Sequence, residues 1–79
     1  MRITVDISMY PLKEDYIEPI KKFIKNINEN KDISIETNKI STQIRGEHDI
    51  VMPLLTKEII NVFESMRASF VIKIIKGND

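Results

Sequence analysis

The sequence predicts an α+β fold in which two helices cover one face of a single antiparallel sheet. Four stretches alternate apolar and polar residues with the period of a strand, and two others repeat apolar residues at helical spacing. Along the chain they follow the order strand, helix, strand, strand, helix, strand. Two βαβ halves of this kind form a ferredoxin-like sandwich with strand order 4-1-3-2. We expect residues 1–79 to form one such domain.

Composition excludes several classes of function. Twelve basic residues balance twelve acidic ones and are interspersed with them, so no basic patch or acidic tail is available for nucleic acid or cations. The chain has no cysteine and one histidine, which leaves no disulfide, thiol nucleophile or histidine-rich metal site. It has no apolar run near the roughly 20 residues of a membrane span. We expect a soluble, cytoplasmic protein without metal or cofactor.

The first strand is the clearest element of the sequence. Apolar and polar residues alternate strictly from Ile3 to Tyr10, and Pro11 ends the strand because it has no N–H for a ladder. The polar face of the strand carries a carboxylate, a hydroxyl and a phenol in one row, at Asp6, Ser8 and Tyr10. This row is the first candidate for a binding surface.

A helix should follow and run to about Asn30, since the apolar residues of segment 16–27 fall on one stripe. Asp15 is the expected N-cap, with Glu18 three residues later completing a capping box. Pro19 instead favours a start nearer Glu18, because proline is tolerated in the first turn of a helix.

Segments 33–36 and 40–45 alternate as two further strands, with Asn38 and Lys39 as a tight turn between them. The alternation points Thr42 into the dry layer between two isoleucines. A second helix opens at residues 47–49, and the last strand runs from Ala68 to about Ile75. The expected core is formed by Ile3, Val5, Ile7, Met9, Ile20, Phe23, Ile24, Ile27, Ile35, Ile44, Val51, Leu55, Ile59, Val62, Phe70, Ile72 and Ile74.

Several functions of ferredoxin-like domains are excluded by missing residues. The third strand has no aromatic residue on which an RNA base could stack, and a copper carrier would need paired cysteines. The segment after the first strand has neither the arginine nor the glycine of an acylphosphatase phosphate loop. No acid–base pair or catalytic triad is visible, so we do not expect an enzyme.

One family resemblance remains. The chain resembles the thiamine-binding YkoF-like family of small ferredoxin-like proteins in the order and spacing of three short motifs. They are Ser-x-Tyr-Pro-Leu at residues 8–12, a glutamate at Glu36, and Ser-Thr-x-Ile-x-Gly at residues 41–46. The second strand departs from the family pattern, ending in Asn38-Lys39 where a His-Pro pair would be expected. The resemblance implies a non-catalytic binder of thiamine or its hydroxymethylpyrimidine half, acting in salvage or intracellular delivery and assembled as dimers or tetramers.

The resemblance and the chemistry of thiamine together suggest a ligand site. The ring of Tyr10 would face the thiazolium cation, and a carboxylate from Asp6 or Glu36 would balance its charge. Three hydroxyl groups would address the pyrimidine nitrogens. The candidate ligand-binding residues are Asp6, Ser8, Tyr10, Glu36, Ser41 and Thr42.

Structural explanations compete with these roles. Asp6 would pair with Lys73 or Arg45 on a neighbouring strand, and Glu36 would protect an edge strand from aggregation. The Thr42 hydroxyl would bond to a backbone carbonyl or wait in a pocket for a ligand.

The alternative function is a homo-oligomeric structural or regulatory module without a small ligand. Its open face would pair subunits through apolar groups such as Ile60, Val71, Ile75 and Tyr10. Under either function we expect a homo-oligomer with two-fold pairing, because the core is small.

Overall fold

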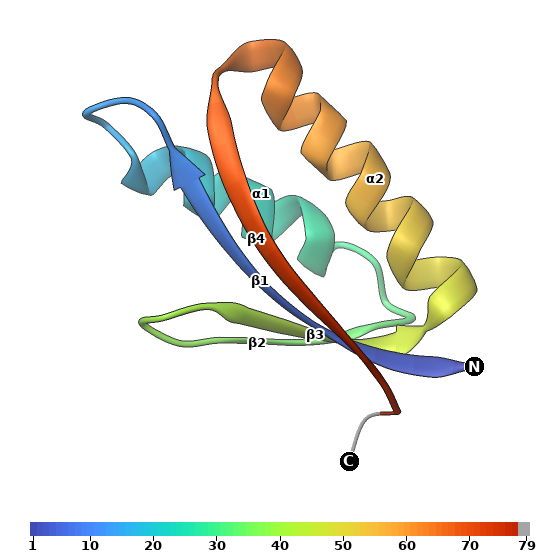
Figure 1. Cartoon of the computed structure of the whole chain (residues 1–79). Helices are drawn as coiled ribbons and strands as arrows, with labels where there is room; N and C mark the ends of the chain where they lie inside the picture. The colour runs from blue at the N-terminus through green and yellow to red at the C-terminus, as the bar shows by residue number, and fades with distance from the viewer. Residues whose placement is uncertain (78–79) are drawn as a thin grey trace.

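The computed structural model describes residues 1–77 and contains a four-stranded antiparallel sheet with two helices on one face (Figure 1). The strand order β2-β3-β1-β4 confirms the predicted ferredoxin-like sandwich. The predicted domain, residues 1–79, includes Asn78 and Asp79, which lie outside the described part. Neither helix of that part is long and apolar enough to cross a membrane. The elements are β1 (Arg2–Pro11), α1 (Ile17–Asn28), β2 (Ser34–Thr37), β3 (Thr42–Glu47), α2 (His48–Ser65) and β4 (Ala68–Lys76).

The inner strand β1 supplies one side of the core, as its alternation predicts. Every second residue from Ile3 to Met9 is buried under the helices. Helix α1 packs against β1, and α2 packs against β3. The buried apolar side chains are Ile3, Val5, Ile7, Met9, Phe23, Ile27, Ile44, Val51 and Leu55.

The prediction that Ile72 and Ile74 are core residues is wrong. They lie opposite Ile7 and Val5 and share their face of the sheet, yet their exposed fractions are 39 % and 52 %. The reason is that β4 is an edge strand, and the helix layer covers the inner strands. Near the beginning of β4, the ring of Phe70 lies against the ring of Phe63 from α2.

Helix α1 begins at Ile17, one residue later than an N-cap at Asp15 would predict. Its N-cap residue is Tyr16, and no side chain of the described residues caps the helix, so the predicted role of Asp15 is wrong. With Ile17 as the first helical residue, Pro19 is the third, within the first turn, where a backbone N–H has no intrahelical partner to lose. The helix ends at Asn28, two residues before the expected end.

The β2–β3 connection is longer than the predicted two-residue turn. The last paired residues are Thr37 and Thr42, so residues 38–41 form the connection. Asn38 organises it, because its Oδ1 accepts hydrogen bonds from the backbone N–H of Ile40 at 2.8 Å and of Ser41 at 3.0 Å. Ile40, predicted to be a strand residue, is 86 % exposed in this turn.

Candidate functional site

The candidate site lies where β1 extends beyond the end of its neighbour β3. The last β1–β3 pair is Ile7 with Thr42, whereas the β1–β4 ladder continues to Pro11. From Ser8 to Pro11, β1 therefore has a free edge. Helix α1 and the turn at residues 38–41 lie around this edge and border an open cavity of about 360 Å³. Cavities of about 300–1,000 Å³ are typical of small-molecule sites.

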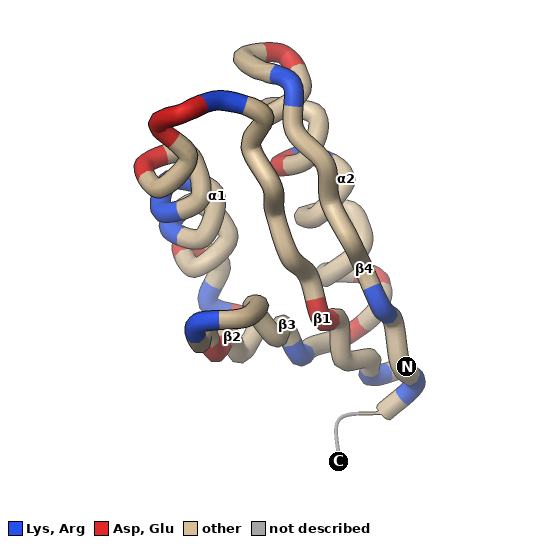
Figure 2. Tube along the Cα trace, turned by 60° about the vertical axis from the view of Figure 1, so that its left-hand side comes forward, with Lys and Arg blue, Asp and Glu red and all other residues tan. Residues whose placement is uncertain are grey.

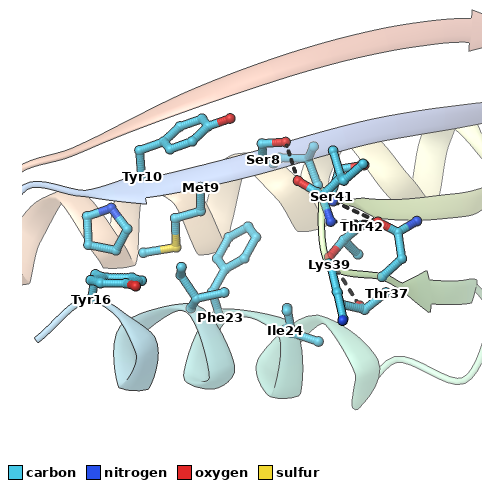
Figure 3. A pocket seen from close by; sticks show the side chains of 15 residues that line it. Ser8, Met9, Tyr10, Tyr16, Phe23, Ile24, Thr37, Lys39, Ser41 and Thr42 are labelled. Atoms are coloured by element: carbon cyan, nitrogen blue, oxygen red, sulfur yellow. Dashed lines mark hydrogen bonds between the residues drawn. The ribbon is translucent and has the colours of Figure 1, made fainter.

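One wall of the cavity is apolar and firmly held. Figure 3 shows Met9 pointing from β1 toward α1, with Phe23 and Ile24 pointing back from the helix. Phe23 is buried, and its ring lies 5.2 Å from that of Phe70 in a tilted arrangement. A flat ligand would meet methyl groups, a thioether and an aromatic ring here.

Hydroxyl groups line the opposite wall, beside the hairpin. Thr42 lies in the helix-facing layer as predicted, with 5 % of its surface exposed. Its hydroxyl shares a hydrogen bond of 3.1 Å with the hydroxyl of Thr37 instead of bonding to a backbone carbonyl. Both threonines line the cavity. Thr37 is absent from the predicted site, although its place opposite Thr42 follows once the hairpin register is known.

Asp6 lies on the other face of the sheet and orients Ser41. Its Oδ1 accepts hydrogen bonds from Ser41 Oγ at 2.6 Å and from Gln43 Nε2 at 2.7 Å. These two hydrogen bonds, the Ser41 bond first, hold the pKa of Asp6 below its ordinary value, against a smaller opposing effect of burial. The charge of Lys73 acts in the same direction as the hydrogen bonds. Lys73 is directly opposite Asp6, as expected, whereas Arg45 lies opposite another β1 residue.

The structure brings four of the six predicted residues together. Ser8, Tyr10, Ser41 and Thr42 line the cavity. Asp6 and Glu36 do not, because Asp6 bonds to the hairpin from the outer face and the exposed Glu36 lies on β2.

The sequence did not point to the contribution of α1. Tyr16, at the N-cap, is half exposed and lines the cavity together with buried Phe23. Both belong to an ordinary amphipathic stripe, and no motif distinguishes them from core residues.

The charge around the cavity differs from the predicted arrangement. Among residues 1–77, Lys39 is the one ionic side chain in the lining, and no carboxylate of that part of the chain belongs to it. A neutral ring fits these walls, and an anionic group would find a cation at the turn. The half-exposed ring of Tyr16 offers a face for a cationic group at the rim, whereas the Tyr10 ring points to the other face of the sheet (Figure 3).

Similarity to known proteins agrees with this fold. A Thermotoga maritima protein provisionally assigned to thiamine biosynthesis or salvage is 21 % identical, with a TM-score of 0.85 over 98 % of this chain and 85 % of that chain. A Streptococcus pneumoniae protein is 18 % identical, with a TM-score of 0.89 over 99 % and 89 % of the two chains. A hypothetical protein of Methanocaldococcus jannascii is 22 % identical, with a TM-score of 0.83 over 99 % and 82 %.

No curated protein matches the chain. The family comparison is decisive, because the YKOF-related family matches residues 2–74, nearly the full length of the sequence. The chain belongs to the YKOF-related family.

Proposed function

We propose that this chain is a non-catalytic binding protein for the pyrimidine half of thiamine, either free as hydroxymethylpyrimidine or within the vitamin, in cytoplasmic salvage or delivery. The observation that carries the proposal is the cavity at the free edge of β1, where apolar walls and hydroxyl groups converge. The assignment of the Thermotoga maritima protein to thiamine biosynthesis or salvage supports the ligand class.

The pyrimidine ring is the half of thiamine that suits the cavity. It is flat and neutral, so it can lie between Met9 and Phe23 without a counter-ion. The Thr42 hydroxyl can donate to a ring nitrogen when Thr37 is the donor of the bond between the two threonines. The cationic thiazolium would remain at the rim, against the ring of Tyr16.

Calorimetric titration tests the proposal with three ligands: hydroxymethylpyrimidine, thiamine and thiamine phosphate. We expect hydroxymethylpyrimidine and thiamine to bind at one site per chain. Thiamine phosphate should bind at least as well as thiamine, because Lys39 lies at the turn. The proposal fails if none of the three gives heat or a thermal shift at millimolar concentration.

A second observation supports assembly into a homodimer or a homotetramer built from such dimers. Strand β4 is one of the two edge strands of the sheet, and it pairs with β1 on one side only. It exposes apolar side chains on both faces, among them Val71, Ile72, Ile74 and Ile75. It carries two lysines and no acidic residue (Figure 2). A long apolar edge strand tends to pair with another strand.

The sequence of β4 favours a second copy as its partner. An antiparallel pair centred on Ile72 overlaps the two strands over their full length. It places Phe70 opposite Ile74 of the second copy, and Lys73 opposite Val71. A pair centred on Lys73 would instead set two like charges face to face, which destabilises a sheet. The favoured register joins two sheets into one.

Sedimentation measures this assembly directly. At tens of micromolar we expect a species of at least twice the 9.2-kDa chain mass. A monomer at that concentration would contradict the assembly proposal. A dimer that binds none of the three ligands would favour the alternative function of a structural or regulatory module.

A further inference from the structure

The backbone of β1 presents its hydrogen-bonding groups alternately to its two neighbours. At its start, the N–H of His48, beside β3, donates to the carbonyl oxygen of Met1 at 2.8 Å. Just beyond its end, the N–H of Leu12 donates to the carbonyl oxygen of Arg67, beside β4, at 3.0 Å. Both registers run without interruption between these points. In an antiparallel strand the N–H and C=O of one residue point to the same side, so the odd-numbered residues of β1 face β3.

Met9 is the first odd-numbered residue of β1 that has no β3 residue opposite it. Continuing the β1–β3 register would place Met9 opposite Ile40, and the two residues would exchange two hydrogen bonds. Both groups of Ile40 are engaged elsewhere: its N–H donates to Asn38 Oδ1 at 2.8 Å, and its carbonyl oxygen accepts from Ser8 Oγ at 3.3 Å. Within residues 1–77, the N–H and C=O of Met9 therefore have no ladder partner.

These two unpaired groups border the cavity. Met9 and its neighbours from Ile7 to Pro11 all line it. A main-chain donor and a main-chain acceptor thus lie next to each other on the side where the ladder stops. Backbone groups away from bulk water need hydrogen-bond partners, and here a ligand can supply them.

We propose that the main-chain N–H and C=O of Met9 bind the edge of a heteroaromatic ring that presents an acceptor beside a donor. In a 4-aminopyrimidine these are a ring nitrogen and the adjacent exocyclic amine. The ring takes the place of the missing β3 residue, as an added strand does at a sheet edge. The inference rests on the proposed function and assigns the main specificity to the backbone, with the Thr42 hydroxyl as a secondary contact.

Replacing one backbone atom tests this recognition. Incorporating the α-hydroxy analogue of methionine at position 9 exchanges the N–H of Met9 for an ester oxygen and leaves all side chains unchanged. Calorimetry with hydroxymethylpyrimidine should show at least a tenfold loss of affinity. The unfolding temperature should fall less than in the control below, because within residues 1–77 the Met9 N–H has no ladder partner, and the ester only weakens the Ser8 carbonyl that faces β4.

The matched control is the same ester at Val5, whose backbone groups lie within the β1–β3 ladder opposite Ile44. It should lower the unfolding temperature and leave the affinity within twofold. On the ligand side, the analogue with hydrogen in place of the 4-amino group should bind the unmodified protein at least tenfold more weakly.

The outcomes separate this inference from the proposed function. If the unmodified protein binds hydroxymethylpyrimidine and the Met9 ester binds it equally well, the inference is wrong and the proposed function stands. If the 4-amino group can be removed without loss, the Met9 carbonyl is not its acceptor and the inference is also overturned. If the unmodified protein binds no pyrimidine, the proposed function fails, and this inference fails with it.

Discussion

The two sides of β1 differ in how far their ladders extend, and the difference separates two kinds of surface. On the β4 side, pairing continues to Pro11. The outer edge of β4 is long and rich in exposed isoleucine and valine. On the β3 side, pairing stops at Ile7 and leaves a concave space with hydroxyls and free backbone groups. An extended apolar edge is suited to another strand, and a short concave gap is suited to a small ligand.

Charge distinguishes the two surfaces as well. The edge of β4 has Lys73 on the outer face of the sheet and apolar side chains on the face toward the helices. The cavity has Lys39 at its turn and uncharged walls elsewhere. Changes at one surface should therefore leave the other intact, and each substitution below tests that independence.

The largest effect is expected from a charge on the β4 edge. Ile74→Lys should weaken self-association by about 100-fold, because the ammonium group would be buried against the apolar face of a second copy. Ile17→Lys is the matched control, since Ile17 is as exposed as Ile74 but lies on α1. Sedimentation over a concentration series measures both. The ligand affinity of both variants should stay within twofold of that of the unmodified protein. If Ile74→Lys associates with itself as strongly as the unmodified protein does, β4 is not the interface.

A smaller effect is expected inside the cavity. Thr42→Val removes the hydroxyl and keeps the shape, so affinity for hydroxymethylpyrimidine should fall about tenfold. The free energy of unfolding should change by less than about 1 kcal/mol, because the exposed partner hydroxyl of Thr37 can bond to water.

Thr37→Val is the control, since it removes the same hydroxyl–hydroxyl bond and leaves Thr42 intact. Its affinity should stay within threefold of the unmodified protein. If Thr42→Val binds as the unmodified protein does, Thr42 has a structural role only.

The smallest effect concerns pH and the outer face. The folded-state pKa of Asp6 is lowered by its hydrogen bonds, so its carboxylate stabilises the fold above the unfolded pKa of about 3.9. That contribution is lost as the pH falls through the lowered pKa. Asp6→Asn should therefore have a lower unfolding temperature than the unmodified protein at pH 7, and this difference should narrow as the pH falls below the unfolded pKa and through the lowered folded one.

Ser41→Ala removes the largest cause of the lowered pKa and should reduce this pH dependence in part. Thermal unfolding followed by circular dichroism measures all three proteins. If the difference in unfolding temperature between Asp6→Asn and the unmodified protein stays constant from pH 7 to about pH 2, the electrostatic account of Asp6 is wrong.

The sequence predicted the fold because strand and helix periods are local properties. The alternation from Ile3 to Met9 and its burial agree residue by residue. The same logic failed for Ile72 and Ile74, because alternation identifies the face of a strand and says nothing of whether a helix covers that face. Coverage is a tertiary property, and an edge strand lies beyond the helix layer.

The candidate site was predictable only where motifs marked it. Ser8, Tyr10, Ser41 and Thr42 stand at the ends of neighbouring strands, so their convergence follows from the fold. The role of Met9 could not be read from its side chain, since it depends on where β3 stops. That end point is set by the four-residue turn that Asn38 organises, a local hydrogen-bond arrangement that strand alternation does not reveal.

The most direct test of the central claim is a titration of the ¹⁵N-labelled protein with hydroxymethylpyrimidine, followed by the backbone amide signals. We expect shifts at residues 8–10, in the turn at residues 38–41 and at the start of α1, with the largest at Met9 and none along β4. Shifts concentrated on β4, or no shift at any amide at millimolar ligand, would contradict the assignment of the ligand to the free edge of β1.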